Sequence, residues 1–192
     1  MPTHRERGAV MVEMAIVVPI FILLLFGMLE FGLAFKDKLA MQHAVANATR
    51  DATIRGNEDI ADMEILDAFE EGLVASASIG AVNHVDIFLA DADGDPVPGR
   101  VNHYQPDGSS CGWDPCPGTV PGPPVYGNPS GYPPCGRDTA YDPTDGVDTI
   151  GIEVEYTHAW VTGLLGFSTR TWHETALARM EPVRFGLENP SC

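Results

Sequence analysis

Basic residues are scarce in this chain of 192 residues. Lys and Arg together number 11 against 27 Asp and Glu, which gives a formal net charge of −16. Nucleic-acid backbones are bound through Lys and Arg, so this composition excludes a non-specific nucleic-acid-binding protein. An acidic surface also repels anionic lipid headgroups.

Motifs that carry catalysis are missing as well. The chain has no Gly-rich phosphate loop, no nucleophile elbow and no pair of histidines on one helix face. His173 and Glu174 are neighbours in a predicted strand, so their side chains point to opposite faces. His158 is expected to be a hydrogen-bonded core residue. We therefore expect a protein that is not an enzyme and that has no cofactor or metal site.

The few basic residues are unevenly placed. Residues 1–8 contain two arginines and one acid, whereas residues 9–35 contain no Lys or Arg and only two acids, Glu13 and Glu30. The remaining part, residues 36–192, holds 24 acids and 9 bases. The chain thus divides into a basic leader, an apolar segment and an acidic soluble body.

The apolar segment 9–35 is long enough to cross a membrane. As a helix it would span about 40 Å, more than the ~30 Å of a bilayer core. An acidic body rich in Pro and Gly offers little to bury a helix that is apolar on all faces. The run also exceeds the apolar part of a secretory signal, so a cleaved signal is the weaker alternative. We predict a transmembrane helix.

The flanks and the cysteines indicate an orientation. Lys36 and Lys38 after the helix nearly balance the arginines before it. The short basic leader favours a cytoplasmic N-terminus, and the cysteines favour an exported body. We therefore predict a single-pass protein of the cytoplasmic (inner) membrane with its C-terminal domain outside.

Cysteine is rare, and its four positions suggest disulfides. An even number of cysteines, three of them in a loop rich in Pro and Gly, is typical of exported proteins with such bridges. Three pairings are open. Zinc is the weaker alternative, because no second closely spaced Cys or His pair follows the first two cysteines. The candidates are Cys111, Cys116, Cys135 and Cys192.

Glu13 distinguishes the helix from an ordinary anchor. A carboxylate within a membrane helix is costly and usually functional. The string RGAVMVEMAIVVP, in which Gly8 ends a basic leader and Glu13 follows four uncharged residues, resembles the processing site of type IV prepilins. The longer string from ERGA through FGMLEFG to the alanine-rich helix ending near Arg50 is similar to the TadE-like family, small pseudopilins of the tight-adherence (Flp) pilus system.

The resemblance implies a processing step. A prepilin peptidase would cut between Gly8 and Ala9, although Met14 replaces the aromatic residue that generally follows the glutamate. The cut exposes an ammonium on Ala9, for which Glu13 would be the counter-charge in a packed helix bundle. The alternative is that Glu13 reaches the membrane interface.

The resemblance also implies a function and partners. It indicates a minor pilin or pseudopilin in the assembly of a Tad/Flp-type pilus, related to adhesion, surface colonisation and secretion. Its partners would be the prepilin peptidase, other pilins and the assembly platform in the membrane. The alternative is a membrane-anchored extracytoplasmic binding module that never enters a fibre.

Glu30 lies near the other end of the apolar segment. Because Lys36 and Lys38 follow within two turns, we predict that Glu30 marks the far membrane boundary, where its carboxylate reaches water. A contact with a partner helix inside the membrane is the alternative.

The body is predicted to be α+β. The first helix should run on to Gly56, and Asn57 should cap a second, amphipathic helix. We expect its apolar stripe to pack on a sheet and its acids to be solvated. The stripe comprises Ile60, Met63, Leu66, Phe69 and Leu73, and the acids are Asp62, Glu64, Asp67, Glu70 and Glu71.

Strand patterns follow the second helix. Residues 85–89 alternate and lead to Asp93-Gly94, a hairpin turn signal. A calcium loop is the weaker interpretation, because its sixth and twelfth positions hold Pro96 and Asn102. Residues 149–160 form the clearest half-buried strand, with an antiparallel return strand ending at Pro182.

Residues 94–146 hold most of the prolines, half of the glycines and three of the four cysteines. Such a stretch predicts a long surface loop without a helix or central strand. Its role is open between a spacer and a contact surface for a partner. The fold as a whole is predicted to be type IV pilin-like: a long N-terminal transmembrane helix, a second amphipathic helix and a small antiparallel sheet with this Pro/Gly/Cys-rich loop.

Overall fold

The computed structural model describes residues 4–55, 58, 60–73, 81–107, 111–117, 131–139, 146–163 and 168–182, with only the backbone for residues 4–7 and 135. Within these residues two α-helices and five strands follow one another, which confirms the α+β prediction. They are α1 (His4–Arg55), α2 (Ala61–Leu73), β1 (Val82–Ala90), β2 (Pro96–Pro106), β3 (Trp113–Asp114), the 3₁₀ turn η2 (Pro134–Gly136), β4 (Thr149–Ala159) and β5 (Thr169–Arg179).

The sheet is antiparallel throughout, in the order β3-β2-β1-β4-β5. Strands β4 and β5 pair along their whole length, from Thr149 opposite Arg179 to Ala159 opposite Thr169. This is the hairpin predicted from the period-two pattern. The inward residues of β4 are fully buried, as that pattern requires: Ile150, Ile152, Val154 and Tyr156.

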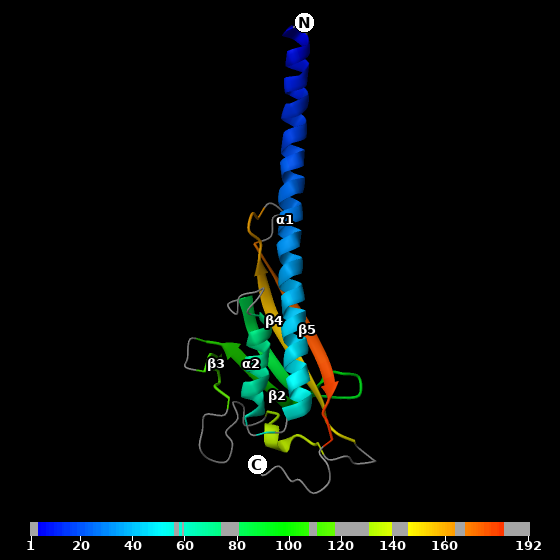
Figure 1. The fold of residues 1–192 in the computed structure, drawn as a ribbon, viewed down its shortest axis with the longest axis vertical. Helices are drawn as coiled ribbons and strands as arrows, with labels where there is room; N and C mark the ends of the chain where they lie inside the picture. The colour runs from blue at the N-terminus through cyan, green and yellow to red at the C-terminus, as the bar shows by residue number, and fades with distance from the viewer. Residues whose placement is uncertain are drawn as a thin grey trace.

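Helices α1 and α2 lie side by side over one face of the sheet, and the N-terminal half of α1 projects beyond the domain (Figure 1). The helices approach closely because small residues face each other. A Cβ added to Gly72 would lie 2.6 Å from the Cα of Ala44, so only glycine fits there. The buried stripe of α1 recurs at intervals of three and four residues: Met41, Ala44, Val45, Ala48 and Ala52.

The β1–β2 hairpin turns at the predicted position. One carboxylate oxygen of Asp91 accepts hydrogen bonds from the amides of Asp93 and Asp95, both at 2.9 Å. Gly94 has a φ of +92°, which favours glycine. The aspartates around Gly94 therefore build a turn.

The prediction that residues 94–146 form only a surface loop is wrong. Strand β2 begins at Pro96 and pairs with β1 through residue 104. Prolines are tolerated at its first residues, next to the turn, because the chain there needs few ladder hydrogen bonds. Beyond them Asn102 and Tyr104 point into the core, and Trp113 and Tyr132 of the same stretch are also buried.

The apolar face of α2 is partly as predicted. Leu66, Phe69 and Leu73 are buried, but Ile60 precedes the helix and is exposed. The stripe packs chiefly against α1. Asn57, the predicted N-cap, lies outside the described residues. The prediction that Asp62 is solvated is wrong: its side chain is buried among polar partners described below.

Candidate functional site

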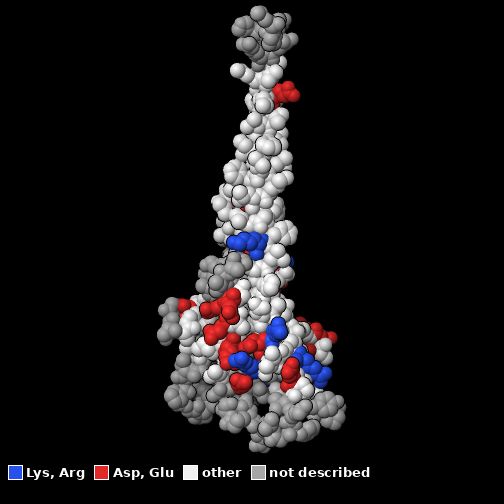
Figure 2. All heavy atoms as spheres, in the orientation of Figure 1, with Lys and Arg blue, Asp and Glu red and all other residues white. Residues whose placement is uncertain are grey.

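The projecting part of α1 is the first candidate site. Its large apolar side chains from Val10 to Leu29 are 42–74% exposed, and the helix is long and apolar enough to cross a membrane. Figure 2 shows this part almost free of charged side chains, which gather on the body instead. Residues 9–29 precede the first contact with the domain and span about 31 Å, close to the ~30 Å of a bilayer core.

Gly8, Ala9 and Glu13 lie near the N-terminal end of this helix. Ala9 and Glu13 are four residues apart, so they occupy the same side of the helix one turn from each other. Glu13 is exposed along the bare helix. A Cβ at Gly8 would meet nothing within 4 Å, so the surroundings of Gly8 do not require a glycine.

Glu30 begins the contact between α1 and the tip of the β4–β5 hairpin. Its side chain is only 1% exposed, and its two carboxylate oxygens accept hydrogen bonds from the backbone amides of Val161, at 3.0 Å, and Thr162. Beside it the rings of Phe31 and Trp160 meet edge to face, 6.0 Å apart. The expectation that the carboxylate reaches water is therefore wrong: backbone amides take the place of water.

A second group of contacts follows about two turns further along α1. Asp37 accepts a 2.7 Å hydrogen bond from Nδ1 of His158, whose ring stacks on Trp172. Lys38 lies 3.4 Å from the carboxylate of Glu174. His158 is the hydrogen-bonded core residue predicted from the sequence. These contacts hold the hairpin against the helix where the bare segment ends.

The profile of the family described as TadE-like protein matches residues 8–50. This N-terminal segment is similar to the TadE-like family. The match confirms the family resemblance seen in the sequence, and this family is pilus-associated and structural. No curated protein and no solved structure matches the chain.

The TadE-like segment contains both acids of the apolar helix and most of its contacts with the domain. It includes the candidate processing position, Glu13, Glu30 and the stripe of α1 that packs on α2 and the sheet. Residues 51–192 lie outside the match.

A buried polar cluster, missed in the sequence, lies in that body. Asp62 of α2 accepts hydrogen bonds on one oxygen from Tyr104 and Asn102, both at 2.6 Å, and on the other from Arg137. The side-chain oxygen of Asn102 in turn accepts a 2.6 Å hydrogen bond from the backbone amide of Tyr132. The Arg137 guanidinium lies 4.7 Å from the centre of the Tyr132 ring. The cluster joins α2, β2 and the segment around η2.

The protonation states and hydrogen bonds of this cluster suit a structural role. Burial, followed by the neighbouring Asp62 charge, raises the pKa of the Tyr104 phenol far above its usual range. Burial and the hydrogen bond to Asp148 do the same to the pKa of Tyr132. Both phenols thus stay protonated, and both oxygens of Asp62 already accept hydrogen bonds. This arrangement suits a fixed joint better than proton transfer.

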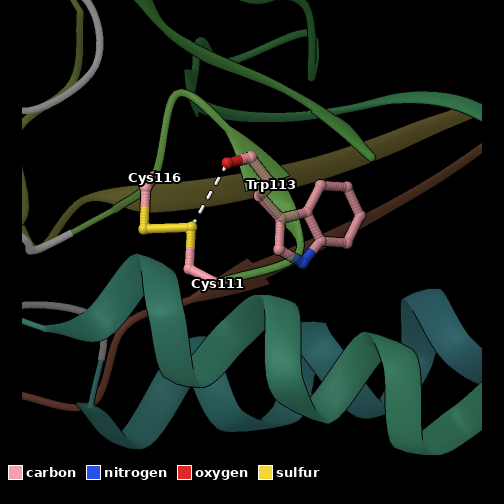
Figure 3. The surroundings of a disulfide bond; sticks show 3 residues. All are labelled: Cys111, Trp113 and Cys116. Atoms are coloured by element: carbon pink, nitrogen blue, oxygen red, sulfur yellow. Dashed lines mark hydrogen bonds between the residues drawn. A yellow bond between two sulfur atoms is a disulfide. The ribbon is translucent and has the colours of Figure 1, made fainter. Parts of the chain in front are cut away.

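A disulfide closes the turn that carries β3. Cys111 and Cys116 are bonded, which confirms a disulfide in the predicted set (Figure 3). The side chain of Cys135 and all of Cys192 lie outside the described residues. The bridge encloses Trp113, which is 1% exposed and meets Phe69 of α2 edge to face at 6.2 Å. The bridge thus fixes the turn that places Trp113 in the core.

One further group in the described part of the chain has the spacing of metal ligands. His84 and Asp86 of β1 and His103 of β2 offer ligand atoms that all lie within 4.8 Å of one another. No local sequence pattern points to this group, because the three residues meet only through the pairing of β1 with β2.

Proposed function

We propose that the protein is a minor pilin or pseudopilin that takes part in the assembly of a Tad/Flp-type pilus. The observation that carries this proposal is the position of Glu13, one helical turn after Ala9, at the start of a bare apolar helix within the TadE-like segment. An ordinary anchor has no need for a carboxylate at that depth.

The proposed first step is removal of residues 1–8 by a prepilin peptidase. Hydrolysis of the Gly8–Ala9 peptide bond leaves a carboxylate on the leader and an ammonium on Ala9. Within a helix bundle in the membrane, Glu13 then neutralises such an ammonium, either its own or that of a neighbouring subunit. The pairing favours packing of the helix with other pilins and with the assembly platform.

The proposed membrane position follows from the length of the bare helix. If residues 9–29 cross the hydrocarbon core, Glu30 and the tip of the β4–β5 hairpin lie at its outer boundary. The basic leader then lies in the cytoplasm and the acidic body outside, where a disulfide persists. Trp160 at the hairpin tip is of the residue type enriched at such boundaries.

Exposed apolar side chains of α1 beyond this boundary favour a fibre subunit over a plain anchor. Phe35 and Leu39 are 65% and 61% exposed on α1, below Glu30. They line an open, mainly apolar groove together with Gly32, Lys36, Ala40, His43 and Gly72. Apolar side chains that lie outside both membrane and core are typical of surfaces that pack against other chains. We propose that neighbouring pilins cover them.

The test of processing is the mature N-terminus, measured by mass spectrometry on the protein from its native membrane. We expect a chain that starts at Ala9, and a Gly8→Leu variant that keeps its leader. Gly27→Leu is the matched control, because a Cβ at either glycine meets nothing within 4 Å. An intact N-terminus in the wild type would indicate the membrane-anchored binding module, and a start near residue 35 a secretory signal.

The test of assembly is the amount of this protein in sheared pili. Glu13→Gln should lower it strongly while cleavage and folding persist, and Phe35→Ser should lower it without unfolding the domain. Met11→Ala, at another exposed position of the bare helix just before Glu13, is the control for a local change in the helix. Normal incorporation of both Glu13→Gln and Phe35→Ser would refute the pilin mechanism.

A further inference from the structure

The face of the sheet opposite the helices carries a group of three side chains from two strands. His84 and Asp86 lie two residues apart on β1, so both point to this face, and Asp86 is the direct partner of His103 on β2. Nδ1 of His103 lies 2.6 Å from Oδ1 of Asp86, and Nε2 of His84 lies 3.9 Å from Oδ2 of the same carboxylate.

The separations fit one metal ion. Zinc takes His nitrogen and carboxylate oxygen at ~2.0–2.2 Å in a tetrahedral arrangement, which places ligand atoms roughly 3.3 Å apart. The three ligand atoms lie within 4.8 Å of one another, so small side-chain rotations bring them to that spacing. Two imidazoles and one carboxylate select zinc and similar transition metals over calcium or magnesium.

We propose that His84, Asp86 and His103 bind a divalent transition-metal ion of the zinc type, with the fourth position open to solvent. The side chains of His84 and Asp86 are 20% and 23% exposed and that of His103 is 44% exposed, so an ion can reach them. Strand β1 is paired on both sides, by β2 and β4, which fixes the positions from which two of the ligands project.

The neighbours of the two histidines match the outer shell of such sites. Ligating histidines usually donate their second ring nitrogen to a carboxylate or another oxygen. Nδ1 of His84 faces Oε1 of Glu155 at 3.9 Å, and Nε2 of His103 faces the side-chain amide of Gln105 at 3.1 Å. That amide turns about its last bond to present its oxygen. Each histidine thus has one nitrogen for the ion and one for an outer partner.

Further charges on the same face favour a cation. Glu153 and Glu155 of β4 lie beside the group, and His173 of β5 lies 3.4–3.5 Å from those two carboxylates. An ion held between β1 and β2 would link these two strands directly. Strand β1 also pairs with β4, and β2 pairs with β3 in the turn that the disulfide closes. Its binding should stabilise the part of the sheet furthest from the membrane helix.

The experiment is zinc titration of the full chain in detergent, purified without a histidine tag and followed by calorimetry, with cobalt as a spectroscopic probe. We expect one ion per chain and a tetrahedral cobalt spectrum. His84→Gln and His103→Gln should each weaken zinc binding by roughly 100-fold or more, and Gln105→Ala by about 10-fold.

His43→Gln is the matched control, because it removes an exposed histidine of α1, on the other side of the sheet from the group. It should leave the affinity for zinc unchanged. Circular dichroism of the metal-free variants shows that each is folded. The proposal is overturned if the wild type binds no zinc, if the His84 and His103 variants bind as it does, or if His43→Gln weakens binding as much as they do.

Discussion

Replacement of Asp62 by Asn should strongly destabilise the body although the two side chains have nearly the same shape. One oxygen of Asp62 accepts two hydrogen bonds and the other accepts one from Arg137. An amide offers a single acceptor oxygen. Whichever way it is turned, its NH₂ group faces a donor, either the Tyr104 and Asn102 side or the Arg137 side.

The magnitude follows from burial. The side chains of Arg137 and Asp62 are 0% and 1% exposed, so water cannot replace the lost carboxylate. Removing one partner of a buried ion pair costs about 3–5 kcal/mol. For a chain of this size 1 kcal/mol shifts the melting temperature by ~2–4 °C, so Asp62→Asn should lower it by roughly 6–20 °C.

The assay is thermal unfolding of the full chain in detergent, followed by near-ultraviolet circular dichroism, which reports the packing of the aromatic side chains, including the buried Trp113 and Tyr104. Asp67→Asn is the control, because Asp67 is exposed on the same helix and its replacement should change stability by no more than about 0.5 kcal/mol. Equal melting temperatures for the Asp62 and Asp67 variants would refute the reasoning from burial.

Three more changes test the packing of the body. Gly72→Ala should cost about 1–3 kcal/mol in urea unfolding, because its Cβ would lie 2.6 Å from the Cα of Ala44; Gly32→Ala, in open space, should cost nothing. Replacing both Cys111 and Cys116 by Ser should cost about 2 kcal/mol, as expected for so short a closed loop, and an unchanged midpoint would contradict that. Since the pKa of Tyr104 is raised in the folded state, the unfolded chain releases this proton first, near pH 10. The contribution of Tyr104 to the free energy of unfolding should therefore be fully present below pH ~10 and be lost above it. In a spectroscopic titration the phenolate absorbance of Tyr104 should appear only when the chain unfolds. Ionisation of all five tyrosines near pH 10 in the folded chain would contradict this.

The elements that the sequence predicted well are those with local signals. The apolar run marks α1, and the alternation in residues 150–158 marks β4 and its return strand. Gly94 marks the hairpin turn because few other residues adopt its φ. Each signal lies within a window of a few residues, and its physical cause, either burial or backbone conformation, acts within that window.

The contacts between segments that are far apart in the sequence have no such local signal. Asp62 falls among the acids of an amphipathic helix, and its burial depends on Arg137, 75 residues further along the chain. Strand β2 was hidden because the prolines and glycines around it dominate the composition of residues 94–146, although Asn102 and Tyr104 alternate with exposed neighbours. The candidate metal ligands likewise require the register of β1 against β2, which no single stretch of sequence contains.

The two acids of the apolar helix show how differently a carboxylate can be satisfied. Glu30 is buried within its own chain against the amides of Val161 and Thr162, whereas Glu13 is exposed on the bare helix. Glu30→Gln should therefore speed hydrogen exchange of those two amides in the isolated protein, because the amide side chain offers one acceptor for two donors.

Glu13→Gln should leave the exchange rates of the same amides unchanged, because Glu13 lies on the bare helix before its first contact with the domain. If Glu13 serves an ammonium in an assembled bundle, its replacement becomes visible only when subunits pack together. Amide exchange in the monomer and incorporation into pili thus separate the two roles. Faster exchange of the Val161 and Thr162 amides in the Glu13 variant would show that both acids act on the same structural element. It would refute the assignment of Glu30 to a contact within the chain and of Glu13 to a contact between subunits.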